Sequence, residues 1–302
     1  MEFLYLLEKL RMPWLTEIML AVTELGGETA FLAIALIVFW CVDKRMGYYL
    51  MSVGFVSTIF NQFLKLFCRI PRPWVRDPGF SAVEEAVPEA TGYSFPSGHS
   101  QSSVGVFGCL AATAKKNWMK ALCIALLALV PFSRMYLGVH TPADVLVGAA
   151  ISLALVFALR PLVYREGGMK WVIAAMLVLA GGYLAYVSFY PFPVDVDMYN
   201  LEHGRESAAT LFGCVAAVAV VYPIEKKWVD FPNSAVWWAQ ILKILGGLAV
   251  VLAVKGGLKA PLAAILPALS ARAIRYFLVV ITAGLLWPMT FRWFEKLGGK
   301  QK

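Results

Sequence analysis

The sequence carries little charge for its length. Asp, Glu, Lys and Arg make up 15% of the 302 residues, whereas hydrophobic residues make up 60%. A soluble chain of this size cannot bury so much apolar surface, so the composition predicts a polytopic membrane protein. Lys and Arg outnumber Asp and Glu by 27 to 19. Basic loops beside a lipid bilayer account for this excess, so we expect no nucleic-acid partner.

Cysteine is scarce and scattered. The five cysteines form no CxxC pair, which argues against a disulfide framework or a cysteine-based metal cluster. No HExxH motif, low-complexity tract or internal repeat occurs. The N-terminal stretch MEFLYLLEKLRM lacks the basic region and cleavage site of a signal peptide, so we expect no cleaved leader.

Nine hydrophobic stretches are candidates to cross a bilayer, which takes about 20 apolar residues, or fewer where the ends snorkel. They predict an all-α fold, a bundle of about nine transmembrane helices at residues 27–42, 47–67, 98–114, 119–139, 142–160, 170–190, 207–223, 238–256 and 273–291. Within residues 1–26, one helical face is apolar and consists of Leu15, Ile18, Met19, Val22 and Leu25. This face predicts either a helix lying in the membrane interface or a buried capping helix.

Charge predicts the orientation of the bundle. The connections after the first, third, fifth and seventh spans, with the C-terminus, hold fifteen basic and five acidic residues, a net charge of +10. The other side holds twelve basic and fourteen acidic residues, a net charge of −2. Because Lys and Arg mark cytoplasmic loops, we expect the N-terminus outside and the C-terminus in the cytoplasm.

Three basic residues depart from the pattern of ordinary loop anchors. Lys65 and Arg72 lie in KLFCRIPRP, at the end of the second span, and Arg134 lies in SRMYLGVHTPAD, at the end of the fourth. Such residues either snorkel to the interface or face a protein interior, because charge at membrane depth is costly. The same predicted side holds His99, His140 and Asp144.

These residue types suit phosphate chemistry. A phosphoryl group in transfer spreads negative charge over its oxygens, so positioning and electrostatic stabilisation dominate its catalysis. Arg72 and Arg134 can each grip two oxygens, and Lys65 adds a compact charge. In YSFPSGHS, Ser97 and Gly98 offer a hydroxyl and backbone N–H groups at a helix start, where the helix dipole favours an anion. Ordinary helix capping by Ser97 explains the same stretch without a ligand.

Together the three segments resemble the signature of the type 2 phosphatidic acid phosphatase superfamily. Its parts are present in order, as Lys65-x6-Arg72-Pro73, Pro96-Ser97-Gly98-His99 and Arg134-x5-His140-x3-Asp144. The resemblance implies a six-helix membrane-embedded phosphatase core over residues 27–190. It leaves residues 1–26 as an interfacial region, and residues 191–302 as a loop and a three-span extension without an assigned role.

The resemblance also implies roles for the site residues. His140 becomes the nucleophile that forms a phosphohistidine, Asp144 orients its ring, and His99 protonates the leaving oxygen and later helps to activate water. Phosphate binding falls to Lys65, Arg72, Ser97, Gly98 and Arg134. Thr141 and Asp144 also have the spacing of a helix-capping pair, and this role is compatible with catalysis. Since three cations already supply positive charge, we expect no metal and no cofactor.

The leading hypothesis is a phosphatase for a membrane lipid phosphate or diphosphate, such as undecaprenyl diphosphate, phosphatidate or phosphatidylglycerol phosphate. Its site would face the outside of a bacterial cytoplasmic membrane. The alternatives are a sugar-phosphate phosphatase like glucose-6-phosphatase, a haloperoxidase, and a transporter or scaffold that binds anionic headgroups without hydrolysis. A loop at 194–206 leaves three interpretations open, namely a solvated acidic loop, a lid over the substrate, or a metal site made by Asp195, Asp197, Glu202 and His203.

Overall fold

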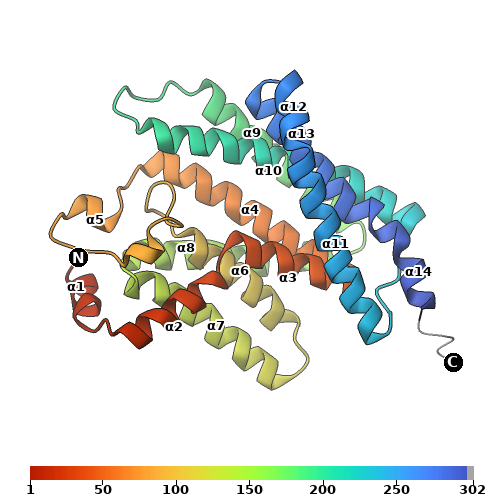
Figure 1. Cartoon of the computed structure of the whole chain (residues 1–302), viewed down its shortest axis with the longest axis horizontal. Coiled ribbons are helices and arrows are strands. Elements are labelled where there is room, and N and C mark those ends of the chain that lie inside the picture. The colour runs from red at the N-terminus through yellow and green to blue at the C-terminus, as the bar shows by residue number, and fades with distance from the viewer. Residues whose placement is uncertain (298–302) are drawn as a thin grey trace. The chain divides into compact units, whose positions relative to one another are not determined.

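The computed structural model describes residues 1–297, and within them every regular element is helical (Figure 1). The all-α, polytopic prediction is therefore confirmed. The α-helices are α1 (Glu2–Lys9), α2 (Pro13–Glu24), α3 (Glu28–Cys41), α4 (Lys44–Cys68), α5 (Pro73–Arg76), α6 (Gly98–Thr113), α7 (Asn117–Tyr136), α8 (Pro142–Tyr164), α9 (Gly168–Phe189), α10 (Met198–Ile224), α11 (Trp237–Gly257), α12 (Lys259–Ile265), α13 (Ala268–Ile281) and α14 (Phe291–Lys296). Short 3₁₀ segments are η1 (Glu84–Ala86) and η4 (Pro288–Thr290), and π-helical segments are η2 (Glu225–Val229) and η3 (Thr282–Leu286).

Seven helical segments among the described residues are long and apolar enough to cross a membrane, compared with the nine predicted. An eighth results if α2 and α3, which meet at a 49° bend, form one broken span. The remaining difference is α6, which has only 16 residues. The limits of both helices lie within one residue of the predicted stretches, since α3 is Glu28–Cys41 and α6 is Gly98–Thr113. The difference in the count therefore comes from the short length of these two helices.

The chain divides into two units, each described by itself. The first comprises residues 1–34, 49–161 and 192–204, and the second comprises residues 35–48 and 162–191 and continues from residue 205. The predicted domain limits at residues 27 and 191 stay a prediction. Lys300 and Lys302, which contribute to the charge count, lie outside the described residues.

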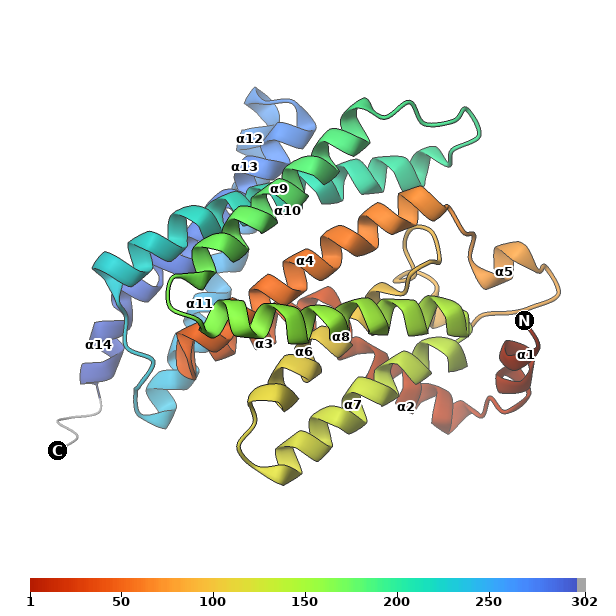
Figure 2. The same ribbon diagram turned by 180° about the vertical axis from the view of Figure 1, so that it is seen from behind.

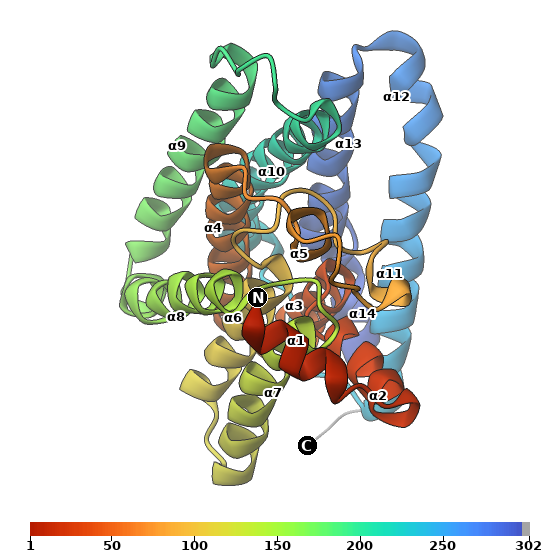
Figure 3. The same cartoon turned by 90° about the vertical axis from the view of Figure 1, so that its left-hand side faces the viewer.

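In the first unit, α6 and α7 pack as a helical hairpin around the short connection at residues 114–116 (Figure 3). Helix α2 crosses α7, where Met19 packs against Tyr136, Leu137 and Val139 (Figure 2). Thus α2 caps the end of α7, which is one of the two predicted arrangements. Its predicted apolar face is only partly buried, because Ile18 is 48% exposed.

Side-chain hydrogen bonds tie α4, α6 and α8 of this unit together. The Tyr49 hydroxyl of α4 donates to the Val156 carbonyl of α8, and the Ser57 and Ser152 hydroxyls lie 3.1 Å apart. Gln101 of α6 donates to the Ser57 carbonyl at 2.8 Å. Because the interior of a bilayer offers no water, such internal partners fix how the helices lie against one another.

In the second unit a buried lysine joins three segments. Lys243 of α11 is fully buried, and its ammonium lies 3.1 Å from the Trp40 carbonyl and 3.3 Å from the Asn233 carbonyl. It also lies 4.2 Å from the centre of the Phe291 ring. These contacts satisfy the charge locally, so Lys243 is a structural element of this unit.

Candidate active site

Four helix ends and two connections bring the predicted site residues together in the first unit. Lys65 lies in the last turn of α4, His99 in the first turn of α6, and Arg134 in the last turn of α7. Asp144 lies in the first turn of α8. Arg72 belongs to the long connection between α4 and α6, and His140 to the short one between α7 and α8. The buried members of this set are Lys65, Arg72, Ser97, Arg134, His140 and Asp144.

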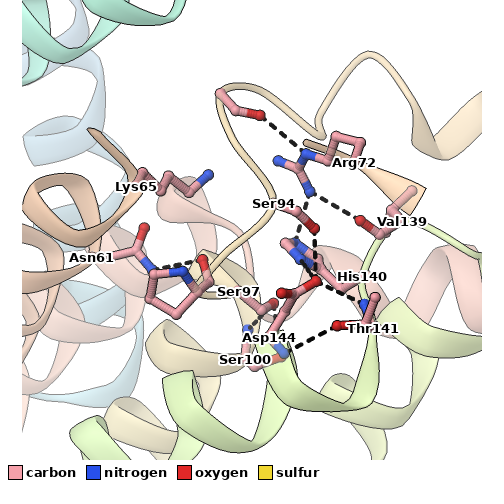
Figure 4. A network of polar contacts seen from close by, with 12 residues as sticks. Asn61, Lys65, Arg72, Ser94, Ser97, Ser100, Val139, His140, Thr141 and Asp144 are labelled. Carbon is pink, nitrogen blue, oxygen red and sulfur yellow. Dashed lines mark hydrogen bonds and ion pairs between the residues drawn. The ribbon is translucent and has the colours of Figure 1, made fainter. Parts of the chain in front are cut away.

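Arg72 holds the centre of the network (Figure 4). Its Nη1 lies 2.9 Å from His140 Nε2 and donates to the Val139 carbonyl at 3.0 Å. Its Nη2 and Nε donate to the Thr91 and Gly92 carbonyls at 2.6 and 3.1 Å. A guanidinium can only donate, so His140 Nε2 is the accepting nitrogen and the ring proton lies on Nδ1.

His140 is 2% exposed, and its Nδ1 faces Asp144. The Nδ1–Oδ2 distance is 3.6 Å, which is longer than a hydrogen bond. The same Oδ2 accepts from the Ser94 hydroxyl at 2.6 Å and from the Thr141 N–H at 2.8 Å. Asp144 therefore forms the predicted helix cap and lies beside the ring at the same time. Burial in the first place, and then the charges of nearby basic residues, hold the pKa of His140 well below its usual value, so the ring is neutral.

A sharp turn at Thr91 and Gly92 presents carbonyl groups to the cations. The Thr91 carbonyl accepts from the Lys65 ammonium at 2.9 Å as well as from Arg72. Gly92 has a φ of +70°, a left-handed conformation that favours glycine. The turn thereby fixes two basic side chains without supplying a negative charge to neutralise them.

Arg134 is fully buried and only partly satisfied. Its Nη1 donates to the Thr23 hydroxyl of α2 at 2.8 Å. Its Nε and Nη2 have no hydrogen-bond partner among residues 1–297. Within this part of the chain, no carboxylate pairs with Lys65, Arg72 or Arg134. Buried donors of this kind are costly unless a ligand completes their hydrogen bonds, and an oxyanion is a suitable one.

Ser97 caps α6, as the structural alternative for this stretch predicts. Its hydroxyl lies 2.9 Å from the Ser100 hydroxyl and 3.4 Å from the Ser100 N–H, and its own N–H donates to the Asp144 carbonyl. A Cβ on Gly98 would meet only the Asn61 side chain, at an ordinary 3.5 Å. His99 Nε2 lies 3.5 Å from a carboxylate oxygen of Glu89. The helix start therefore places one histidine beside an acid and leaves room at Gly98.

The structure adds four residues that the sequence reasoning missed: Thr23, Glu89, Ser94 and Gly148. A Cβ on Gly148 would lie 2.7 Å from the Ser97 carbonyl, so this glycine lets α8 approach the start of α6. Its spacing, one turn after Asp144, is a signal that could have revealed it. No local signal links Thr23 to Arg134, because 111 residues separate them.

The loop at 194–206 packs near the second motif. The Asp197 N–H donates to the Tyr93 hydroxyl at 3.3 Å, and the Asp197 carboxylate accepts from the Asn200 N–H at the start of α10. Within residues 1–297, no three His, Cys, Asp or Glu side chains form a group suited to a metal ion. Asp195, Asp197, Glu202 and His203 therefore do not form such a group in the described part of the chain.

Several phosphatases are similar to this chain. Phosphatidylglycerophosphatase B of Bacillus subtilis is 29% identical over 164 residues, covering 50% of this chain and 76% of the relative. Bovine glucose-6-phosphatase 3 is 26% identical over 209 residues, covering 62% of this chain and 60% of the relative. Undecaprenyl-diphosphatase of Sulfolobus acidocaldarius is 30% identical over 139 residues, covering 44% of this chain and 64% of the relative. No solved structure matches.

Two family models also match. The first, described as the PAP2 superfamily, covers residues 45–167, and every predicted site residue lies within this range. The second, described as a PAP2 superfamily phosphatase transmembrane extension, covers residues 206–300 and accounts for the part of the chain that follows the site. With both models matched in order along one chain, this protein belongs to the PAP2 superfamily of phosphatases.

Proposed function

We propose that this protein is a metal-independent phosphatase that cleaves a membrane lipid phosphate or diphosphate through a phosphohistidine at His140. The observation that carries this proposal is the 2.9 Å contact between Arg72 Nη1 and His140 Nε2. It sets a neutral, buried imidazole beside cations that form no ion pair with a carboxylate within residues 1–297. This combination suits attack on a phosphorus atom whose oxygens the cations hold.

When the substrate binds, each of the three cations contacts an oxygen of its phosphate. Arg134 has two free donor groups for this purpose, and Lys65 and Arg72 can exchange carbonyl partners for the anion. Arg72 then releases the Nε2 lone pair of His140 as it turns to the substrate. The N-terminus of α6 at Gly98 adds backbone N–H groups and the positive end of its dipole.

The reaction runs in two displacements. His140 Nε2 attacks phosphorus, a P–N bond forms, and the bond from phosphorus to the lipid oxygen breaks as His99 donates a proton to that oxygen. The phosphorylated ring is positively charged, and Asp144 stabilises it through Nδ1–H. Water then attacks phosphorus and gives its proton to His99, and the P–N bond breaks to release phosphate.

A lipid substrate fits a site at the ends of membrane helices, where a hydrocarbon tail can enter sideways. Two relatives carry names of lipid phosphatases, phosphatidylglycerophosphatase B and undecaprenyl-diphosphatase. A sugar phosphate is the second candidate, because the similarity to glucose-6-phosphatase 3 extends over 62% of this chain. Binding without hydrolysis leaves His99, His140 and Asp144 unexplained, since cations alone suffice for binding.

Phosphate release by the purified full-length protein tests this proposal. We expect turnover of phosphatidylglycerol phosphate, phosphatidate or undecaprenyl diphosphate to exceed that of glucose 6-phosphate, and a chelator to leave the rate unchanged. Preference for glucose 6-phosphate would establish the second candidate. Loss of activity with a chelator, restored by one divalent ion, would overturn the metal-independent mechanism.

We also place the site at the extracytoplasmic face of the membrane, and of a bacterial cytoplasmic membrane in particular. The charge difference of +10 against −2 supports this orientation. In a background without native cysteines, Glu85→Cys lies in the exposed connection between two motifs and should react with an impermeant thiol reagent in intact cells. Asn117→Cys, also exposed but at the start of α7, should not. The reverse labelling pattern would invert the orientation.

A further inference from the structure

The second unit contains a cavity that the phosphatase chemistry does not use. Its volume is about 660 Å³. The start of α4, the connection between α8 and α9, and the end of α10 with η2 form its walls. All three segments belong to connections that the charge pattern assigns to the cytoplasmic side.

Most of the acidic groups that line the cavity are already committed to partners. The Lys44 ammonium lies 2.9 Å from a Glu225 carboxylate oxygen and 2.6 Å from an Asp230 carboxylate oxygen. The Tyr48 hydroxyl donates to the other Glu225 oxygen at 3.5 Å. The Asp43 carboxylate accepts from the Met46 N–H at 2.6 Å at the start of α4. Lys44 and three acidic side chains, Asp43, Glu225 and Asp230, therefore already have partners within the protein.

Three basic side chains of the same lining remain without an acidic partner in the described chain: Arg45, Arg165 and Lys226. Aromatic groups support two of them. The Arg45 guanidinium lies 5.9 Å from the centre of the Tyr164 ring, and the Lys226 ammonium lies 6.0 Å from that of Tyr222. Four basic and four acidic side chains line the cavity, so its total charge is balanced. Among the groups without an ion-pair or hydrogen-bond partner described above, however, the three bases outnumber the one acid, Glu166, and these bases are the groups that can meet an anion.

Tryptophans of the same connections indicate the depth of this cavity in the membrane. Trp171 and Trp228 are each 68% exposed, and each carries a neighbouring lysine over its ring, Lys170 at 5.4 Å and Lys227 at 5.0 Å. Exposed Trp beside Lys is typical of the headgroup level of a bilayer. The N-terminus of α9, which no side chain caps, adds backbone N–H groups to the wall at Gly167 and Met169.

We propose that this cavity binds the phosphate headgroup of an anionic phospholipid from the cytoplasmic leaflet. Arg45, Arg165 and Lys226 contact the phosphate, and the tryptophans hold the acyl side of the site at the interface. Basic pockets between membrane helices on this side recognise anionic headgroups in this manner. The site is separate from the proposed catalytic chemistry, and it gives the second unit a role in retaining a lipid.

The test uses full-length protein in detergent and short-chain phosphatidylglycerol, a phosphodiester that the proposed reaction does not cleave. Short-chain phosphatidylcholine and inorganic phosphate serve as reference ligands. We expect phosphatidylglycerol to bind at least about 10-fold more tightly than phosphatidylcholine. Removing all three charges by Arg45→Gln, Arg165→Gln and Lys226→Gln should weaken its binding about 100-fold, at about 5-fold per charge.

A matched triple variant, Lys115→Gln, Lys116→Gln and Lys120→Gln, removes the same charge from another exposed connection and should bind normally. Both triple variants should keep phosphatase activity, which verifies folding. An equal loss of lipid binding in both would show that only surface charge matters and would overturn the proposal. Displacement of bound phosphatidylglycerol by an equal concentration of inorganic phosphate would also overturn the proposal, because the site would then recognise a soluble anion instead of a lipid.

Discussion

Both units of the molecule contain buried or half-buried basic side chains, but these side chains find different partners in the two units. In the second unit Lys44 is paired with Glu225 and Asp230, and Lys243 is surrounded by backbone carbonyls and an aromatic ring. In the first unit Lys65 and Arg72 also contact backbone carbonyls, but together with Arg134 they lie within electrostatic reach of one another. No carboxylate is paired with these three cations among the described residues.

This difference distinguishes a structural charge from a functional one. A buried cation with its own partners stabilises the fold locally, and it leaves no demand for a ligand. Three neighbouring cations that are not paired with an acid repel one another, so the fold bears an electrostatic cost that an incoming phosphate relieves. Removing one cation from each unit therefore gives the sharpest predictions.

The largest contrast is between Arg134 and Lys44. Arg134→Gln keeps a donor near Thr23 but removes the charge, and we expect kcat/KM to fall about 10²- to 10³-fold with little loss of stability. Lys44→Gln leaves Glu225 buried without its cation, so we expect a loss of about 1–3 kcal/mol in unfolding free energy but normal turnover per folded molecule. Phosphate-release kinetics and thermal unfolding in detergent measure both. Equal effects of the two variants on turnover would remove the distinction.

A smaller contrast concerns two helix glycines. Gly148→Ala places a methyl group 2.7 Å from the Ser97 carbonyl, so it displaces the start of α6 and should lower kcat about 10- to 100-fold. Gly181→Ala in the second unit meets only Phe212, at 3.9 Å, and should leave kcat unchanged. Similar kinetics for both variants would show that the close approach of α8 to Ser97 is dispensable.

The sequence alone singled out the candidate site residues because each motif is local. The spacing of the polar residues can be recognised within each motif, namely KLFCRIPRP, YSFPSGHS and SRMYLGVHTPAD. Each motif also lies at the end of a predicted membrane span, and the predicted spans place all three on the same side of the bilayer. The contacts that complete the site are not local. Thr23 reaches Arg134 only after α2 packs on α7, and Ser94 reaches Asp144 only after the connection folds back over α8.

The start of α6, by contrast, was predicted from a local signal, because Ser97 is a capping residue and the helix begins at Gly98 as expected. The close approach of α8 to this start at Gly148 was not predicted, because it depends on how the two helices pack. Likewise, the apolar face predicted for α2 missed Thr23, because a buried threonine with a basic partner is indistinguishable in sequence from an exposed one.

The smallest effect is on the pH dependence of stability. Burial and neighbouring cations hold the pKa of folded His140 well below 6.5, so the unfolded chain binds more protons below that pH and stability falls as pH decreases. Between pH 7.5 and 5.5, we expect the wild type to lose about 1 kcal/mol more than His140→Gln.

Asp230 in the second unit behaves differently. The hydrogen bond from Lys44 lowers its pKa below 3.8, so its contribution is present above that pH and is lost only in stronger acid. Thermal unfolding of the wild type, His140→Gln and Asp230→Asn across this range separates the two. A loss of stability above pH 5 in the wild type that His140→Gln does not reduce would contradict the assignment to His140.

Trapping the covalent intermediate tests the central claim most directly. Full-length protein mixed with a ³²P-labelled lipid phosphate and quenched in alkaline detergent should carry a base-stable, acid-labile label, and peptide mapping should place it on His140. His140→Ala should lack both the label and turnover, whereas His203→Ala should retain the label. A label on any other residue, or near-normal turnover by His140→Ala, would contradict the account.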